Sequence, residues 1–406
     1  MGFGQGLSGL QAASQNLDVI GNNIANSGTI GFKSGSTSFA DVYANSRVGL
    51  GVKVAAVNQR FTAGTVSGTG GEYDIAIDGA KGFFRVTDAS DNIVYTRSGE
   101  FGIDKNFFIT NAMGYRLTGY PVGGIGTNLV PLQVPQANIA PQETNAASIQ
   151  TNLNANAKIV PAAPAFDPAN QDTYTDLVPT TIYDSLGNSH QMVQYFVKRA
   201  PVNGESVYDI YYTVDGKPAT VDGGQPSSRL TFNSAGVLTG GQPNRDIEIT
   251  GLGSTTSPAR DITVRMNYQN VTHFGSDFGP KVTANGYSSG EFSGISIEKN
   301  GTIMAKYTNG ESQAVGTIAL ANFNNVGGLK PVGDSSWVET GESGQAIMGQ
   351  PGTNGLATLF GQALEQSNVE MSQELVNMIV AQRTYQANAQ TIKTQDEVLQ
   401  VLINMR

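Results

Sequence analysis

Residues 367–406 read SNVEMSQELVNMIVAQRTYQANAQTIKTQDEVLQVLINMR and contain neither Gly nor Pro, in a chain that has 50 glycines among 406 residues. Ser367 followed by Glu370 fits a capping box, which predicts that a helix starts here. The apolar positions then recur at three-, four- and seven-residue steps and share one face: Leu375, Met378, Tyr385, Ile392, Leu399 and Ile403. A helix of about 39 residues would be roughly 58 Å long, too long to lie on one core. It needs a partner.

The N-terminus predicts a second amphipathic helix. Its apolar residues keep the same spacing: Phe3, Leu7, Leu10, Leu17 and Ile24. The helix is expected to end at the run Asn22–Gly28, whose Asn and Gly residues tolerate left-handed backbone. Glycines in its first turns weaken it by about 1 kcal/mol each relative to Ala, so we expect it to be disordered alone.

Both ends therefore carry an apolar stripe that neither end buries by itself. Pairing of the two helices, as in a coiled coil, is the simplest solution, although more than 300 residues separate them. One heptad row of the C-terminal helix is partly polar and reads Leu375, Gln382, Ala389, Asp396, Ile403. Because Asp at a core position makes a poor two-stranded coiled coil, we infer that the pair becomes stable only against further copies. Folding of the ends would then be coupled to assembly.

Composition bounds the class of protein. A length of 406 residues suits two or three domains. The net charge of −9 argues against nucleic-acid binding, and the absence of Cys excludes disulfides and thiolate metal sites. No apolar run is long enough to span a membrane. No Lys or Arg precedes Lys33 and no apolar run follows Met1, so we do not expect a cleaved signal peptide. If the protein is exported, we expect the export machinery to recognise an uncleaved N-terminus.

Between the ends the apolar period changes to two, which predicts strands. The first group starts around Val52 and Val54 and continues through residues 75–77, 82–86, 95–101 and 120–121. Residues 122–165 are rich in Pro, Asn, Gln and Ala and are expected to cross between domains.

A second β region spans about residues 180–266, with a hairpin expected around the turn DSLGN at 184–188, and strands resume from 295 to 320. We therefore predict a mostly β fold with paired helical termini and nested all-β domains. The expected segments are 1–24 with 366–406 (terminal helices), 25–70 with 352–365 (connection), 71–146 with 286–351 (inner β domain) and 147–285 (inserted outer β domain).

Two short matches to enzyme motifs carry little weight. Gly4, Gly6 and Gly9 satisfy G-x-G-x-x-G, but no strand precedes them. Gly286 to Gly290 satisfies G-x-S-x-G, but both histidines precede Ser288, whereas that fold needs one after it. We expect surface or turn positions for both histidines, no catalytic residue, no metal and no cofactor.

A row of glutamines along the C-terminal helix is more informative. Gln382, Gln386 and Gln390 step by four, and Gln400 falls on the same general face. One interpretation is a solvated helix face. The other is the lining of a channel, which is polar enough to stay wet and too weakly charged to hold passing chains.

The two ends resemble the flagellar axial proteins, the family of rod and hook subunits. The resemblance rests on LDVIGNNIANSGTIGFK at 17–33 and on residues 367–399, with YDIAIDGAKGFFRV at 73–86, YTRSGEF at 95–101 and GYRLTGYP at 114–121 similar to the inner β domain. It is weak from about 147 to 285. Because the distal rod member lacks a large inserted domain, the insertion favours a hook-type member.

The resemblance implies a homopolymer: a short curved tube that joins rod to filament, transmits torque as a universal joint and encloses a channel for unfolded subunits. The implied partners are the distal rod protein, the hook cap protein, the hook–filament junction protein and the flagellar type III export apparatus, with no nucleic acid and no membrane insertion. It also assigns assembly contacts to the terminal helices: Leu7, Leu10, Leu17, Ile24, Leu375, Met378, Ile379, Tyr385, Ile392, Leu399 and Ile403.

Two alternatives stay open at this point. A rod or filament-junction protein would share the same ends. A secreted carbohydrate-binding β protein would use its β domains differently and would lose glycan binding on changes to Asp or aromatic residues of the outer domain.

Overall fold

The computed structural model describes residues 3–42, 49–124, 128–240, 242–253 and 258–404. The chain forms two compact units. Unit 1 comprises Met1–Gln136, Ser293–Lys306 and Ser312–Arg406, and unit 2 comprises Ala137–Phe292 and Tyr307–Glu311. The fold is mostly β with a helix at each end, as the sequence predicts.

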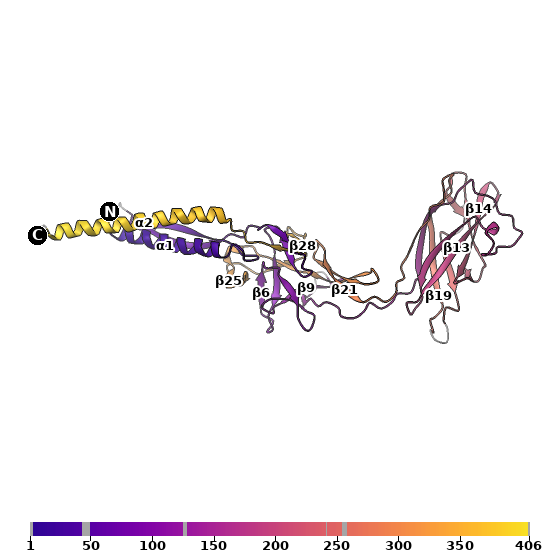
Figure 1. Ribbon diagram of the computed structural model, residues 1–406, viewed down its shortest axis with the longest axis horizontal. Coiled ribbons are helices and arrows are strands. Elements are labelled where there is room, and N and C mark those ends of the chain that lie inside the picture. The colour runs from indigo at the N-terminus through magenta and orange to yellow at the C-terminus, as the bar shows by residue number, and fades with distance from the viewer. Residues whose placement is uncertain (1–2, 43–48, 125–127, 241, 254–257, 405–406) are drawn as a thin grey trace. The chain divides into compact units, whose positions relative to one another are not determined.

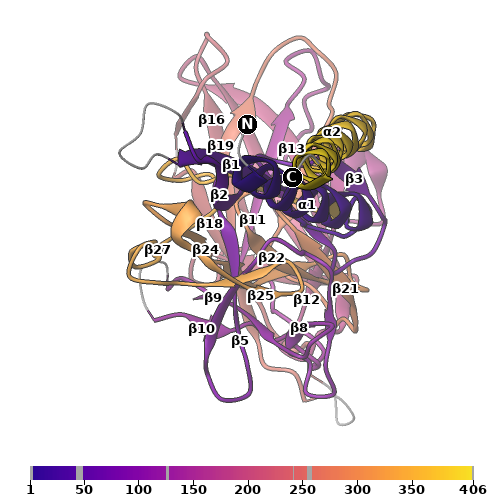
Figure 2. The same ribbon diagram turned by 90° about the vertical axis from the view of Figure 1, so that its left-hand side faces the viewer.

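Two helices open and close unit 1. Helix α1 spans Phe3–Ala25 and helix α2 spans Met371–Asn404. They lie side by side and antiparallel, so segments from opposite ends of the sequence are in contact (Figures 1 and 2). The predicted pairing of the terminal helices is confirmed.

The start of α2 differs from the capping-box prediction. The first backbone bond of the helix runs from the Glu374 N–H to the Glu370 carbonyl at 3.0 Å, so Glu370 and not Ser367 precedes the helix. Ser367 instead accepts a bond from the Val369 N–H at 3.3 Å, and the Asn368 side chain bonds other segments. Residues 405 and 406, the last two of the predicted helix, lie outside the described residues.

A long hairpin follows α1. Its strands are β1 (Gly35–Val42) and β2 (Gly51–Gln59), and both contact α1. Asn23 of α1 clamps the start of β1, since its amide donates to the Gly35 carbonyl and accepts from the Gly35 N–H, both at 2.8 Å. At the other end the Gln5 amide donates to the Gly49 carbonyl at 2.6 Å. The hairpin therefore lies along α1.

The rest of unit 1 is a β domain. Its main sheet runs in the order β21-β22-β23-β9-β5-β6-β26-β25, with five further strands joined at its sides. The bounds in chain order are β5 (Phe83–Thr87), β6 (Ile93–Thr96), β7 (Phe101–Ile103), β8 (Ile109–Asn111), β9 (Arg116–Pro121), β10 (Val130–Pro131), β21 (Phe292–Ile297), β22 (Thr302–Tyr307), β23 (Ser312–Ile318), β24 (Leu320–Asn322), β25 (Lys330–Gly333), β26 (Ser336–Val338) and β27 (Ile347–Gly349). A short 3₁₀ turn, Val326–Gly328, precedes β25.

Two small strand pairs bring the chain back towards the helices. Strand β3 (Val66–Gly68) pairs with β29 (Ala363–Glu365), and β4 (Ile75–Asp78) pairs with β28 (Thr358–Gly361). An aromatic cluster around Trp337 fills the neighbouring core, with Phe83 and Phe61 packed edge-on at 5.6 and 5.5 Å. Sequence segments nearly 300 residues apart therefore share one core.

The predicted strand at residues 95–101 is split. Strand β6 ends at Thr96 and β7 begins at Phe101. Between them Arg97 turns inward and is buried, and Gly99 passes so close to the Ile75 carbonyl that a Cβ would lie 1.6 Å from its oxygen. The alternating pattern did not reveal this break.

Unit 2 holds a ten-stranded sheet in the order β12-β13-β14-β15-β18-β19-β11-β20, with β16 and β17 at the side. Its bounds are β11 (Ala146–Asn152), β12 (Asp176–Tyr183), β13 (Ser189–Val202), β14 (Glu205–Val214), β15 (Lys217–Val221), β16 (Ser228–Phe232), β17 (Leu238–Gly240), β18 (Asn244–Ile249), β19 (Ile262–Thr272) and β20 (Lys281–Ala284), with a 3₁₀ turn at Gln171–Thr173. The edge strands β12 and β20 contact each other, so the sheet curls around a core that includes Phe196, Tyr212 and Tyr268.

The expected hairpin around DSLGN is confirmed as β12 and β13. The expected loose crossing at residues 122–165 is wrong in part, because it contains β10 and β11, an interior strand of the unit 2 sheet. Strand β11 lies between β19, parallel, and β20, antiparallel. Its inward side is mostly small, with Ala147 and Thr151 beside Ile149, so composition alone concealed it.

The histidine expectation is wrong for His273, which is buried against the Tyr208 and Phe232 rings at 5.5 and 5.4 Å. His190 lies between the turns of two hairpins, as expected. Its Nδ1 lies 2.6 Å from Asp215 Oδ2 and its Nε2 lies 3.3 Å from Asp184 Oδ2. Within the described ranges, no helix combines the length and apolarity that crossing a bilayer needs.

Candidate functional site on the terminal helices

The contact between α1 and α2 is made by small residues. Gly9 faces Asn388 so closely that a Cβ there would lie 2.7 Å from Asn388 Oδ1, and one on Gly6 would lie 3.0 Å from Ile392 Cγ1. Ala12, Ala13 and Ala381 are buried around the same contact. Glycine and alanine let two helix backbones approach closely, and the Asn388 and Ile392 side chains of α2 pack over Gly9 and Gly6.

The apolar stripes predicted for assembly lie elsewhere. Leu7, Leu375, Ile379, Tyr385, Leu399 and Ile403 are exposed, while Leu10, Leu17, Ile24, Met378 and Ile392 are half-buried. Ile403 is the extreme case, with 72% of its surface exposed. The structure therefore brings few of these side chains together within one chain, and their role in assembly stays a prediction.

The four glutamines are all exposed on α2. At 100° per residue they fall within roughly 80° of one another and roughly 140° away from the buried Ala381. The glutamine row thus lies nearly opposite the α1 contact, and the Gln400 amide donates a local hydrogen bond to Asp396 Oδ2 at 3.1 Å.

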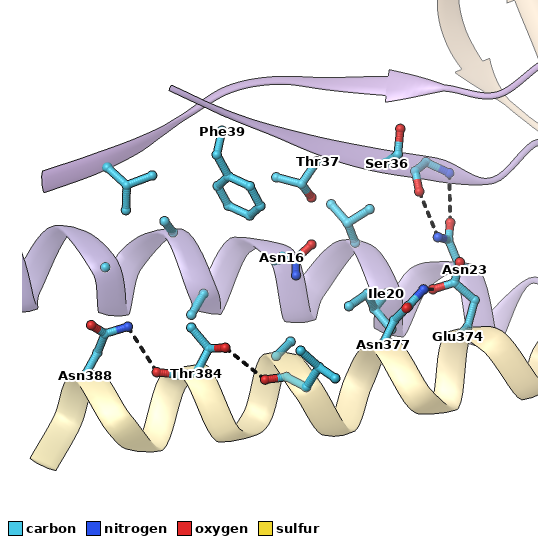
Figure 3. Close-up of a pocket in the computed structure, with 18 of the residues that line it drawn as sticks. Asn16, Ile20, Asn23, Ser36, Thr37, Phe39, Glu374, Asn377, Thr384 and Asn388 are labelled. Carbon is cyan, nitrogen blue, oxygen red and sulfur yellow. Dashed lines mark hydrogen bonds between the residues drawn. The ribbon is translucent and has the colours of Figure 1, made fainter. Parts of the chain in front are cut away.

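A groove opens where α1, α2 and the β1–β2 hairpin meet. It has a volume of about 800 Å³ and its floor is the buried face of α1. Figure 3 shows Phe39 and Thr37 of the hairpin pointing towards α1, with Thr384 and Asn388 of α2 on the other side. Of the described residues that line it, only Arg60 and Glu374 are charged.

Sequence reasoning missed a buried ionic junction beneath the helices. Glu365 binds Lys33 at 2.7 Å and Arg97 at 3.0 Å, and all three side chains have no exposed surface. Lys33 also donates to the Thr62 carbonyl and Arg97 to the Gly79 carbonyl, at 2.8 and 2.9 Å. The one signal was the presence of these two cations in the runs GFK and YTR, which belong to segments that resemble the flagellar axial proteins.

Burial lowers the pKa of Lys33, and the neighbouring Arg97 acts in the same direction, while the Glu365 carboxylate opposes them. One carboxylate thus compensates two buried cations. Because an unpaired charge in a dry interior is costly, the junction is stable only with Glu365 in place. It ties the segment after α1, the inner β domain and the segment before α2 into one body.

The two matches to enzyme motifs do not form catalytic sites in the part of the chain that the structure describes. Gly4, Gly6 and Gly9 lie within α1, and Gly286–Gly290 is extended, with Tyr287 and Gly290 bridged to Gln142 and Ile139. A search of the described residues finds no group of His, Cys, Asp and Glu side chains that could hold a metal ion.

Comparison with known families matches four successive parts of the chain. Residues 5–33 match "Flagella basal body rod protein", 76–154 match "Flagellar hook protein FlgE/F/G D1 domain", 152–287 match "Flagellar basal body protein FlaE D2 domain" and 361–405 match "Flagellar basal body rod FlgEFG protein C-terminal".

Curated relatives match along the whole chain. The flagellar hook protein FlgE of Escherichia coli strain K12 is 43% identical over 414 residues, covering 100% of both chains. FlgE of Borreliella burgdorferi is 31% identical over 448 residues, covering 99% of this chain and 98% of that protein. Among solved structures, the crystal structure of Helicobacter pylori flagellar hook protein FlgE2 has a TM-score of 0.54 at 14% identity, covering 74% of this chain and 100% of that one, a likeness of fold.

Proposed function

The chain belongs to the family of flagellar hook proteins FlgE, and we propose that it builds the hook by polymerising through its paired terminal helices. Membership makes it a structural subunit of the flagellar hook and not an enzyme, located in the hook and basal body. The manner of assembly, the channel and the individual partners go beyond membership and are argued below.

The observation that carries the proposal is the unsatisfied surface of the helix pair. Small residues hold α1 and α2 together, whereas large apolar side chains such as Leu375, Leu399 and Ile403 remain in contact with water. Exposed apolar surface of this extent is typical of an interface. Neighbouring subunits that cover the stripes would stabilise the helices and form the inner wall of a tube.

The glutamine row supports a channel inside that wall. If the α1 side of α2 faces outward in the polymer, the opposite side, with Gln382, Gln386 and Gln390, faces the axis. Amide side chains keep such a surface wet without fixed charge. Replacing Gln386 and Gln390 by Leu should slow export of later subunits, measured as filament growth on hooks of normal length; unchanged growth would remove the channel-lining role.

The surface of unit 2 suits contacts that slide. Its ion pairs include exposed ones, such as Arg265–Asp246 at 2.8 Å and Arg260–Glu143 at 2.6 Å. Exposed pairs of this kind are worth little individually and exchange readily. We therefore infer a polar outer layer that lets a curved tube bend while it turns, acting as a universal joint, around a more apolar inner wall.

The remaining partners follow from this role. The tube would join the distal rod protein at one end and the junction protein at the other, grow beneath a cap protein, and receive subunits through the type III export apparatus without a cleaved signal. The four-part division into terminal, connecting, inner and outer segments is proposed on the same basis.

Assembly in a strain that lacks its hook protein tests the proposal. The chain should restore hooks, seen by electron microscopy of purified hook–basal bodies. Replacing Leu375 and Leu399 by Ser should reduce hooks at least tenfold, whereas Ser at Val237, a similarly exposed residue of unit 2, should not. Normal hooks from the helix variant would contradict assembly through these stripes.

A further inference from the structure

The groove between α1, α2 and the hairpin is open and incompletely satisfied. Its floor is made of small buried residues of α1, among them Gly9, Ala12 and Ala13. Phe39, half exposed, overhangs it from β1 (Figure 3). The buried Thr37 hydroxyl, which also lines it, has no hydrogen-bond partner among the described residues. An occupant would pack against the exposed Phe39 ring and extend the buried contact between α1 and α2.

The C-terminal end of α2 extends past α1 and lacks a surface to pack on. At the level where Gly6 meets Ile392, α1 is close to its first residue, Phe3, so α2 continues without a partner in its own chain. The side chains described between Asp396 and Asn404 are all exposed. This free end of α2 therefore has no surface of its own chain to lie on.

The apolar residues of this free end lie on the same face of α2 that contacts α1 earlier in the helix. Leu399 comes about five turns after the buried Ala381, and Ile392 and Ile403 fall within roughly 40° of the same line. The stripe that packs on α1 thus extends past α1 as large apolar residues. A surface like α1, lined with small residues and carrying few charges, is what such a stripe would fit.

We propose that the free end of α2, residues 396–404, docks in the groove of a neighbouring subunit. The inference rests on the proposed function, because only a polymer of this chain supplies the neighbour. Leu399 and Ile403 would lie over the floor of the next groove, beneath Phe39. The groove is continuous with the α1–α2 contact, so the docked helix would extend an interface that already exists in each chain.

Cysteine cross-linking tests this in a chain that has no native cysteine. Subunits carrying only Phe39→Cys are co-assembled with subunits carrying only Leu399→Cys, so that any disulfide between the two must join different chains. We expect at least tenfold more cross-linked pair in assembled tubes than among unassembled subunits. Ser36→Cys, at another residue that lines the groove, replaces Phe39→Cys if the latter does not assemble.

Two matched mixtures identify the occupant. Ser38→Cys with Leu399→Cys is the control, since Ser38 is exposed on the same strand but does not line the groove. Phe39→Cys with Leu7→Cys tests α1 of the neighbour instead. Equal yields with Ser38→Cys, or a higher yield with Leu7→Cys, overturn the inference. Tubes seen by microscopy without the Phe39–Leu399 cross-link overturn the docking while leaving polymerisation intact; absence of tubes from the unmodified chain would reject the proposed function itself.

Discussion

Glu365 joins distant parts of unit 1, because its carboxylate compensates Lys33 and Arg97 together. None of the three has exposed surface, so water cannot substitute for a missing partner. Sequence patterns predicted apolar stripes and turns, which depend on neighbours along the chain. They could not predict this junction, because its members lie at positions 33, 97 and 365 and meet only through the tertiary fold.

Replacing Glu365 by Gln should destabilise unit 1 by about 3 to 5 kcal/mol, since it leaves two buried cations without a counter-charge. The single Trp, Trp337, is 2% exposed and reports on unit 1, so denaturant unfolding followed by its fluorescence measures the loss. Glu370→Gln, at an exposed carboxylate nearby, is the control. Equal stability of the two variants would show that the junction contributes nothing.

His190 should make unit 2 sensitive to pH. Burial alone would lower the pKa of His190, but its hydrogen bonds to Asp215 and Asp184 raise it above the ordinary 6.5. The charged imidazole therefore stabilises the folded unit fully below the unfolded-state pKa, and this contribution is lost as the pH rises through the folded-state pKa. Charge-assisted bonds of this kind are worth about 1.5 kcal/mol.

Urea unfolding of the chain, followed by near-ultraviolet circular dichroism of its buried tyrosines, should show unit 2 weakening from pH 6 to about pH 9. His190→Gln should remove that loss and lower stability at pH 6, leaving the opposite slope of His273, whose pKa burial lowers. The same slope in both proteins would mean that another group titrates. The lowered pKa values of Asp184 and Asp215 act at acid pH and lie outside this window.

At the scale of elements, the sequence predicted those with strong local signals. Helix α1 and the β12–β13 hairpin appear where spacing and turn residues place them. Strand β11 was missed because two of its three buried side chains, Ala147 and Thr151, are small or polar. The start of α2 was misplaced because Ser367 and Asn368 bond elsewhere. For the helix pair, the stripe of large residues drew attention, but glycine and alanine make the contact within one chain. Small residues give no periodic signal in a chain so rich in glycine.

Gly9 and Gly4 of α1 allow close packing on α2 to be tested separately from helix propensity. Gly9→Val should weaken the helix pair by about 1 to 3 kcal/mol, because the new side chain meets Asn388. Gly4→Val carries the same change in helix propensity at a position with nothing within 4 Å. Heating assembled tubes and measuring subunit release should show a lower midpoint for Gly9→Val than for Gly4→Val. Coincident curves would argue against close packing of α1 on α2.

At the scale of the whole molecule, unit 2 is an insertion whose two connections run side by side. The Ile139 N–H donates to the Gly290 carbonyl at 3.0 Å, and Gln142 and Tyr287 bridge at the next step. Neighbouring entry and exit points are typical of domains that fold independently of their host. The nested order was predictable from where strand patterns pause and resume, whereas the pairing of the two connections was not.

Joining residue 136 to 293 through a short glycine linker should therefore leave unit 1 folded. The free energy of unfolding reported by Trp337 fluorescence should stay within about 0.5 kcal/mol of that of the full chain. Excised residues 137–292, which are unit 2 without Tyr307–Glu311, should unfold cooperatively by circular dichroism. Red-shifted Trp337 emission in the shortened chain at zero denaturant would show that unit 1 depends on the insertion.

The position of Glu365 near the end of the chain also sets an order of events. A polypeptide is made from its N-terminus, so Lys33 and Arg97 exist for some 270 to 330 residues of synthesis before their shared counter-ion does. Until then both cations must stay hydrated, and the body beneath the helices cannot close. A chain that ends before Glu365 cannot form this junction, so unit 1 closes only in subunits synthesised past residue 365.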